Sequence, residues 1–319
     1  MNQSPMNQSS MDEPRTVKVL TLGARVNLSA PEVRRDALDT LENGGVVFLP
    51  ESGFALTTTE REMISNPQAL LAGFKEPEVP NGRPTIVFDP RRGKIKHHFN
   101  SVHGKMVRAQ VRRACRPPLE AMMARFCTWV DDMITTLFPS YREVLVPDRV
   151  TYRPYPRDRR QPLHIDSSYG YPTQGRGMLR LFCNVDPKNR PRVWQVGEPF
   201  EPFVRRFIPS VELRQPHWSA SVLDRLGIVR GSKTLYDQMI ADIRRLAKRD
   251  KEYQRTAPRE IVEFPSGSCW FAITDLVPHG AISGQHSLDQ TFFLPAAGMG
   301  TPDHSSLRIL ERLSGRSLA

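Results

Sequence analysis

The second half of the chain, from Pro147 onward, consists of short apolar segments separated by turn residues. These segments are RVTYRP, PLHID, MLRLFCNV, PRVWQVG, IVEF, SCWFAITDL, GAIS and QTFFLP. Apolar runs of this length, bounded by turn signals, are typical of β-strands, because a helix needs a longer periodic run. Many short strands within one half of a chain predict a double-stranded β-helix, or jelly roll, as its core.

The first half of the chain shows a different pattern, with apolar residues at helical spacing. Residues 31–45 predict a helix that ends at Gly44 and Gly45, and VVFLP follows as a short buried strand. Residues 57–74 predict a second helix. Residues 75–104 are rich in Pro, Gly and charge, which favours a long loop.

Two further helical regions are expected. Residues 105–137 have helical periodicity, and we expect Pro117 and Pro118 to divide them into two helices. Residues 198–256 interrupt the strands with a helical pattern that ends in the basic run RRLAKRDK. The fold class predicted is therefore α+β, with a jelly-roll core, N-terminal helices and a helical insertion.

These patterns suggest one domain preceded by a tail. Residues 1–15 are polar and predict a disordered tail, whereas residues 16–319 predict a single domain. Within it we expect a helical part at 16–147 and a jelly-roll part at 148–319, with the insertion at about 198–256.

The net charge bears on the kind of partner. Lys and Arg number 45 against 34 Asp and Glu, which gives a formal charge of +11. Such a surplus favours nucleic acid, an acidic lipid surface or an acidic small substrate. A nucleic-acid binder would interleave aromatic residues in a known motif layout, and the basic segments PRRGKIKHHFNS and VRRACR do not. We therefore expect no nucleic-acid partner.

Cysteine usage and the terminal sequence bear on the compartment. The four cysteines lie far apart without a CxxC pair, which argues against a disulfide framework or a zinc site. The start of the chain has neither the basic nor the apolar region of a secretory signal. No apolar stretch approaches the roughly 18 to 20 residues that a membrane span requires. We expect a cytoplasmic protein.

The pair His164 and Asp166 is the first candidate for chemistry. If PLHID is a strand, these two side chains point to the same face, because side chains alternate along a strand. A third histidine from a distant strand would complete the 2-His-1-carboxylate triad that holds Fe(II) and leaves positions open for substrate and dioxygen. The alternative for an isolated HxD is a surface contact.

Arg180 adds to this pattern, because it interrupts the apolar strand segment MLRLF. Leu179 and Leu181 would face one side of the strand and Arg180 the other. Given an iron site, its guanidinium could grip the distal carboxylate of 2-oxoglutarate. Thr291, just before FFLP, could offer its hydroxyl to the same carboxylate. An exposed arginine on a half-buried strand is the alternative.

The third metal ligand is expected near the C-terminus, where two histidines are candidates. His279 opens the apolar segment GAIS, as a residue at the start of a strand. His286 follows the turn signal Ser283-Gly284 and so lies between strands. We favour His279 as the ligand; His286 would contact the co-substrate or be a satisfied polar histidine.

The chain resembles the Kdo hydroxylases, bacterial Fe(II)/2-oxoglutarate dioxygenases that act on the sugar acid Kdo of lipopolysaccharide. The resemblance lies in RVTYRP, LHIDSSYGYPTQGRGMLRLFCNVDP, PRVWQVGEPFE, TDLVPHGAISGQHSLDQTFFLP and LENGGVVFLP. It implies a jelly-roll core, Fe(II) held by His164, Asp166 and His279, and 2-oxoglutarate held partly by Arg180, with dioxygen as the second co-substrate. The stretch after HID and the length of residues 219–256 depart from the family pattern.

The same resemblance implies a substrate and a location. The reaction would be hydroxylation at C3 of Kdo, in a lipid A precursor at the inner face of the cytoplasmic membrane, with peripheral contact to anionic lipid. Since Kdo carries a carboxylate, guanidinium groups near the triad are candidate contacts: Arg153, Arg159, Arg160 and Arg192. Two other functions fit the residues less well, namely a 2-oxoglutarate oxygenase acting on a protein side chain and a non-enzymatic nucleic-acid binder.

Overall fold

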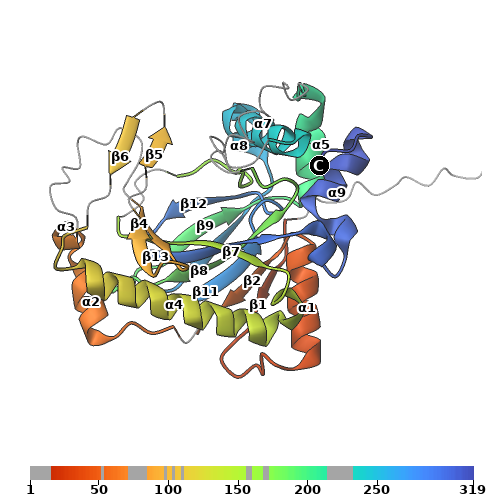
Figure 1. Ribbon diagram of the computed structural model, residues 1–319. Coiled ribbons are helices and arrows are strands. Elements are labelled where there is room, and N and C mark those ends of the chain that lie inside the picture. The colour runs from red at the N-terminus through yellow and green to blue at the C-terminus, as the bar shows by residue number, and fades with distance from the viewer. Residues whose placement is uncertain are drawn as a thin grey trace, which may run out of the picture.

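Two facing β-sheets form the centre of the molecule in the computed structural model (Figure 1). The structure describes residues 16–51, 54–70, 85–96, 99–102, 105–108, 111–155, 160–167, 172–213 and 233–319. The large sheet has the strand order β1 (Val19–Thr21), β2 (Val46–Leu49), β11 (Cys269–Ile273), β8 (Gly177–Asn184), β13 (Ser287–Leu294), β7 (Val146–Arg153), β3 (Ile86–Asp89) and β4 (Lys94–Lys96). The small sheet has the order β10 (Glu260–Phe264), β9 (Arg192–Val196) and β12 (His279–Ser283).

Helices lie on two sides of these sheets (Figure 1). They are α1 (Pro31–Glu42), α2 (Thr58–Ser65), α3 (Pro67–Leu70), α4 (Arg116–Leu137), α5 (Phe200–Phe207), α7 (Leu235–Arg249), α8 (Lys251–Thr256) and α9 (Ser306–Ser314). Helices α1 and α4 run along one side of the large sheet, and α5, α7, α8 and α9 gather on the opposite side of the molecule. Among the described residues, no helix has the length and apolar character for a membrane span.

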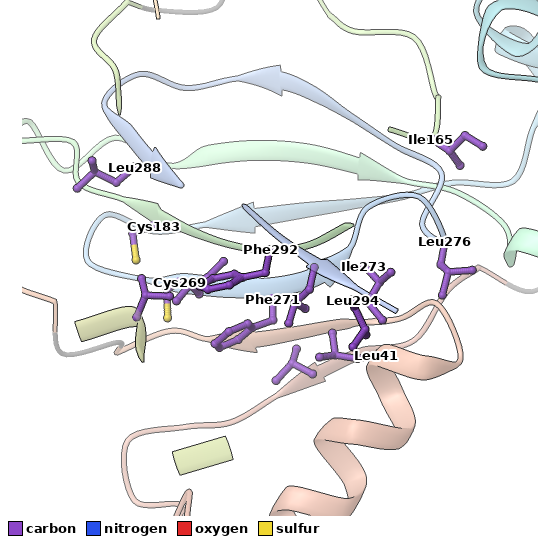
Figure 2. Packing of buried hydrophobic residues seen from close by; sticks show 14 of the residues in the cluster. Leu41, Ile165, Cys183, Cys269, Phe271, Ile273, Leu276, Leu288, Phe292 and Leu294 are labelled. Carbon is purple, nitrogen blue, oxygen red and sulfur yellow. The ribbon is translucent and has the colours of Figure 1, made fainter. Parts of the chain in front are cut away.

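Alternation of side chains divides the core into two clusters. On β8, Leu179 and Leu181 belong to the larger cluster. Figure 2 shows part of this cluster, with Phe271 and Leu294 among the labelled residues. Phe182, the residue after Leu181, points the other way and contacts Trp194 of the small sheet. Between the sheets lies a second cluster that is rich in aromatic rings, including Phe48, Phe182, Trp194, Phe264 and Trp270. This arrangement confirms the predicted α+β fold with a two-sheet core.

The turn after α1 shows why glycine is needed there. Helix α1 ends at Glu42, and Gly44 then adopts a φ of +72°, which L side chains rarely adopt. At Gly45, a Cβ would lie 2.7 Å from the backbone oxygens of Lys18 and Thr40. The chain therefore turns tightly into β2, as the sequence predicts.

Helix α4 corrects one prediction. Pro117 and Pro118 do not divide residues 105–137 into two helices; they occupy the first turn of one helix, Arg116–Leu137. Proline is tolerated there because the first N–H groups of a helix have no intrahelical acceptor. The start of the region is strand β6 (Lys105–Arg108), which pairs with β5 (Phe99–Val102).

The expected long loop at 75–104 is also wrong in part. Strands β3 and β4 lie within it and extend the large sheet beyond β7. Sequence periodicity missed them because they are three or four residues long and are separated by a turn around Gly93, which has positive φ. The N-terminal part at 16–147 is therefore not purely helical.

Other predictions are confirmed within the part of the chain that is described. The insertion at 198–256 contains α5, α7 and α8, and the region 57–74 contains α2 and α3. The predicted tail at 1–15, the end of the second helix at 71–74 and residues 214–232 of the insertion lie outside the described residues.

Candidate metal centre

His164 lies on an extended segment that meets the first residue of β12. The backbone N–H of His164 donates to the carbonyl of His279 at 3.0 Å, and the N–H of His279 donates back at 2.9 Å. Only an isolated bridge forms here, so PLHID is not the regular strand that was predicted. The N–H of Asp166 donates to the carbonyl of Thr274 at 2.8 Å, which fixes the far end of the segment.

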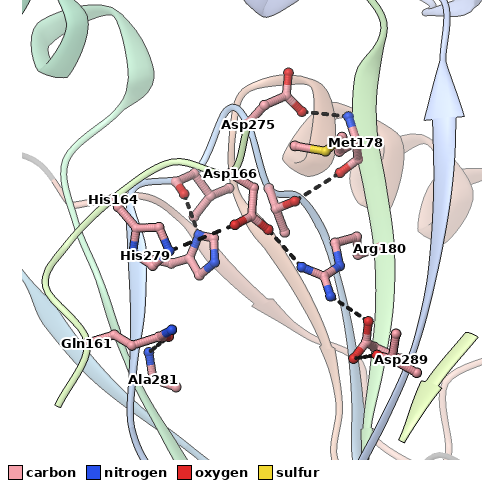
Figure 3. Close-up of polar contacts among 12 residues, drawn as sticks. Gln161, His164, Asp166, Met178, Arg180, Asp275, His279, Ala281 and Asp289 are labelled. Atoms are coloured by element: carbon pink, nitrogen blue, oxygen red, sulfur yellow. Dashed lines mark hydrogen bonds and ion pairs between the residues drawn. The ribbon is translucent and has the colours of Figure 1, made fainter. Parts of the chain in front are cut away.

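The alternation expected at this segment is nevertheless present. Leu163 and Ile165 are fully buried in the larger core cluster, so the side chains of His164 and Asp166 point the other way. His164 Nε2 lies 3.8 Å from Asp166 Oδ1. Together with His279, these two residues offer ligand atoms that all lie within 4.8 Å of one another (Figure 3). The three side chains are therefore spaced to hold one metal ion.

Backbone carbonyls set the orientation of both imidazoles. His164 Nδ1 lies 2.8 Å from the carbonyl of Pro162, and His279 Nδ1 lies 2.8 Å from that of Val277. A carbonyl oxygen only accepts, so each Nδ1 must carry the proton and donate it. Each Nε2 then presents its lone pair, which is the arrangement of metal-binding histidines. Trp194 stacks on the His279 ring with centroids 4.8 Å apart and holds it in plane.

The electrostatics suit a cation. Burial lowers the pKa of His164 to about 3 and also lowers the pKa of His279, so both rings are neutral at neutral pH. Burial acts to raise the pKa of Asp166, but the guanidinium of Arg180 and the other basic groups nearby together outweigh burial and hold that pKa well below its ordinary value. The group thus presents two neutral nitrogens and one carboxylate.

Arg180 lies beside this group, on the face of β8 that was predicted. Its Nη1 donates to Asp166 Oδ2 at 2.7 Å, and its Nη2 donates to Asp289 Oδ2 at 2.5 Å (Figure 3). Its Nε is buried and has no hydrogen-bond partner in the structure as described. Thr291 of β13 stands directly opposite Arg180 in the strand register. The guanidinium of Arg180 therefore contacts two carboxylates, and its binding of an anion stays a prediction.

Asp289 is a residue that the sequence reasoning missed. It is fully buried on β13, where it accepts a hydrogen bond from Thr151 Oγ1 at 2.6 Å and pairs with both Arg153 and Arg180. The sequence does contain a signal for Asp289. It interrupts the apolar strand segment SLDQTFFL with a charge, which is the pattern that singled out Arg180. Asp289 balances two arginines beside the candidate metal centre.

Gln254 of α8 was also missed, and it connects the insertion to the centre. Its Oε1 accepts from the N–H of Leu163 at 2.8 Å, and its Nε2 donates to the carbonyl of Leu163 at 2.9 Å. The same Nε2 donates to the carbonyl of Ala247 on α7 at 2.9 Å. One amide side chain therefore pairs with the residue before His164 as a neighbouring strand would.

His286 lies outside the metal-binding group. It occupies the turn between β12 and β13 with a φ of +49°, and its Nδ1 lies 2.7 Å from Tyr152 Oη. It is 2% exposed. These contacts match the alternative of a satisfied polar histidine and give no support to a contact with the co-substrate.

The candidate substrate arginines are not gathered at one point. Arg153 pairs with Asp289, and Arg160 is exposed and donates to Gln195 Oε1. Arg192 is buried, 5% exposed, and packs against Gly284. Arg159 lies outside the described residues.

Comparison with known proteins identifies the family. The family model described as 3-deoxy-D-manno-oct-2-ulosonic acid (Kdo) hydroxylase matches residues 25–317. The chain belongs to the Kdo hydroxylase family. A search of curated proteins gives no match.

Solved structures of a Kdo hydroxylase, KdoO, are similar over nearly the whole chain. The complex of KdoO with α-ketoglutarate and Fe(III) is 28% identical with a TM-score of 0.79, covering 94% of this chain and 97% of that one. The complex with succinate and Fe(III) has the same identity and TM-score and covers 96% and 97%. This likeness agrees with the predicted jelly-roll architecture. It does not favour the protein-side-chain oxygenase or the nucleic-acid binder.

Proposed function

We propose that this member of the Kdo hydroxylase family hydroxylates Kdo at C3 within a lipid A precursor, using Fe(II), 2-oxoglutarate and dioxygen. Its iron- and 2-oxoglutarate-dependent chemistry follows from its family and from the likeness to KdoO, which is a non-heme Fe(II) α-ketoglutarate-dependent dioxygenase. The observation that carries the proposal is the convergence of His164, Asp166 and His279 within 4.8 Å.

The donor set fits Fe(II). Two neutral imidazoles and one carboxylate form the 2-His-1-carboxylate triad of non-haem iron oxygenases, and the described residues provide no thiolate among these ligands. We assign His164 Nε2, Asp166 and His279 Nε2 as ligands, and not His286. The bound iron supplies the oxidising chemistry, in which 2-oxoglutarate and dioxygen give succinate, carbon dioxide and a hydroxyl group on the substrate.

The charges around the site suit a dianionic co-substrate. Arg153 and Arg180 are balanced by Asp166 and Asp289, so a divalent cation would add two uncompensated positive charges. The two carboxylates of 2-oxoglutarate would balance them. We propose that Arg180, through its buried Nε–H, and the hydroxyl of Thr291 bind its distal carboxylate.

The acceptor is anionic in this proposal, since Kdo carries a carboxylate. Arg153, Arg159 and Arg192 remain the candidate contacts for that carboxylate, whereas the guanidinium of Arg160 contacts the amide oxygen of Gln195. The net charge of +11 would also favour peripheral contact with anionic lipid at the inner membrane face, where a lipid A precursor is available.

Anaerobic binding of Fe(II) and 2-oxoglutarate, followed by succinate release with and without a Kdo-bearing lipid A precursor, tests the proposal. We expect succinate formation to depend on the acceptor, and product analysis by NMR to place the new hydroxyl at C3. His164→Ala and His279→Ala should lose stoichiometric iron, whereas His286→Ala should retain it. Full iron content in both ligand variants, or an acceptor recovered unmodified, would refute the proposal.

A further inference from the structure

Two arginines converge on one neutral oxygen at the small sheet. Arg160 Nε donates to Gln195 Oε1 at 3.1 Å, and its Nη2 contacts the same oxygen. Arg259 Nη1 also donates to that oxygen, at 3.0 Å. An amide oxygen has two lone pairs and no formal charge, so it satisfies the donors only in part and offsets neither positive charge.

The orientation of the Gln195 amide is fixed by its other end. Gln195 Nε2 donates to the carbonyl of Gln161 at 2.6 Å, so Oε1 must face the arginines. Gly280 makes room for this contact, since a Cβ there would lie 2.7 Å from the Gln161 carbonyl oxygen and 3.0 Å from Gln195 Nε2. The contacts of Gln195 within the small sheet therefore fix the position of the oxygen that both guanidinium groups share.

Arg259 is held in place by the backbone as well. Its Nε donates to the carbonyl of Ala257 at 3.1 Å, and its Nη2 donates to that of Gln254 at 2.6 Å. No carboxylate pairs with Arg160 or Arg259 within the part of the chain that the structure describes. Burial and the nearby charge of Arg160 lower the pKa of Arg259, as expected for two cations without a counter-ion.

The pair also lies close to the metal centre along the chain. Arg160 precedes His164 by four residues, so their Cα atoms are at most about 14 Å apart, because an extended residue spans up to about 3.6 Å. The N–H of Gln161 donates to the carbonyl of Ala281 on β12, the strand that His279 begins. The N–H of Ala281 donates back to Gln161 Oε1 at 3.1 Å (Figure 3). A group bound at Arg160 would thus be within reach of a saccharide whose reacting sugar lies at the metal centre.

We propose that Arg160 and Arg259 bind a phosphate monoester of the acceptor, an inference that rests on the proposed function. A phosphate monoester carries about −1.5 to −2 charge near pH 7, so it offsets two guanidiniums where a carboxylate offsets one. Both arginines keep N–H groups that Gln195 does not use, and guanidinium forks match phosphate oxygens bidentately. The site would orient a phosphorylated lipid A precursor so that its Kdo residue reaches the metal.

Steady-state kinetics with two acceptors tests this site. A Kdo-bearing lipid A precursor is compared with the same molecule after its phosphates are removed, in detergent micelles without phospholipid. For the wild type, we expect KM to rise on the order of 10-fold when the phosphates are removed, as for loss of a charge-assisted contact. Arg160→Gln should raise KM for the phosphorylated acceptor by a similar factor and leave KM for the other acceptor unchanged. The kcat value and the KM for 2-oxoglutarate should not change.

Arg255→Gln is the matched control, because Arg255 is exposed on α8 and already paired with Glu252 at 2.7 Å. It removes one positive charge nearby and should behave as the wild type. Equal KM values for the wild type and Arg160→Gln on the phosphorylated acceptor would overturn the phosphate site while leaving the hydroxylase function intact. An equal rise on both acceptors would also overturn it, by showing a structural role. A wild type that hydroxylates neither acceptor would refute the proposed function itself, and this inference with it.

Discussion

Arg180 Nη1 lies 2.7 Å from Asp166 Oδ2, so the residue that we expect to bind the co-substrate also contacts a proposed ligand of the metal. We therefore expect a single guanidinium to influence the binding of both the co-substrate and the metal. Its charge keeps the Asp166 carboxylate ionised, and its Nη2 contact with Asp289 fixes its own orientation. Co-substrate and metal affinity should consequently change together when Arg180 changes.

Replacing Arg180 tests this coupling. Arg180→Ala should raise the KM for 2-oxoglutarate roughly 10- to 100-fold and weaken Fe(II) binding, as is typical for loss of a group that supports a metal ligand. Arg180→Lys keeps the positive charge but loses the forked guanidinium group. It should therefore restore only part of the 2-oxoglutarate affinity and of the Fe(II) affinity. Succinate assays over a range of 2-oxoglutarate concentrations, with iron titration, measure the two effects. A co-substrate KM that stays at the wild-type value would contradict the assignment.

Asp289 should matter for stability as well as for activity. Asp289→Asn removes the buried charge that pairs with Arg153 and Arg180, and leaving buried charges without their partner costs about 3 kcal/mol or more. We expect a loss of this size in the free energy of unfolding in urea, together with a higher KM for 2-oxoglutarate. Asp303→Asn, at an exposed position, is the control. Unfolding curves that superimpose on the wild type would argue against this role.

Gln254 should position His164 although it touches no ligand. Gln254→Ala leaves the N–H and the carbonyl of Leu163 without their side-chain partner, so the segment that carries His164 should become less well held. We expect Fe(II) affinity to fall by about 10-fold, within the range for outer contacts of metal sites. Lys251→Ala, exposed on the same helix, should have no effect. Isothermal titration with Fe(II) under anaerobic conditions measures this affinity, and an affinity of Gln254→Ala equal to that of the wild type would contradict the positioning role.

The buried His286 predicts a pH dependence of stability. Burial, only partly offset by Asp186, lowers the pKa of His286 to about 4 from 6.5. Between these two values the unfolded chain binds the proton and the folded chain does not, so stability falls as pH falls below about 6.5. At pH 5, the titration of His286 should lower the free energy of unfolding by about 2 kcal/mol relative to neutral pH.

His286→Asn isolates this contribution, because Asn tolerates the positive φ at this position. The variant should show a shallower loss of unfolding free energy between pH 7 and pH 5 than the wild type does. Denaturation in urea at a series of pH values measures the difference. Parallel pH profiles for the two proteins would show that His286 titrates normally.

Sequence patterns predicted the elements in which local and tertiary forces agree. The apolar alternation of MLRLF correctly placed Leu179 and Leu181 in the core and Arg180 opposite to them. Helix α1 and its glycine ending also follow from local preferences alone. The HxD pair and His279 come together in the structure because both segments are extended, although only one of them belongs to a sheet strand.

The predictions that were wrong, and the contacts that were missed, have physical explanations. Strands β3 and β4 are too short for periodicity to reveal, and pairing with β7 stabilises them. Prolines at positions 117 and 118 were expected to break a helix, but their effect depends on whether they lie at its start. The contacts of Gln254 with Leu163 join residues 91 positions apart, and no local pattern reveals such a pair.

The reciprocal hydrogen bonds between His164 and His279 join parts of the chain that are separated by 115 positions in sequence. These two residues are the ends of a very long loop. A metal ion bound to both imidazoles would therefore act as a reversible cross-link, with an entropic effect comparable to that of a disulfide that closes the same loop. Loading with metal thus becomes a step in completing the fold. Protection of the 160–167 backbone against hydrogen exchange would then report the fraction of the enzyme that has iron bound.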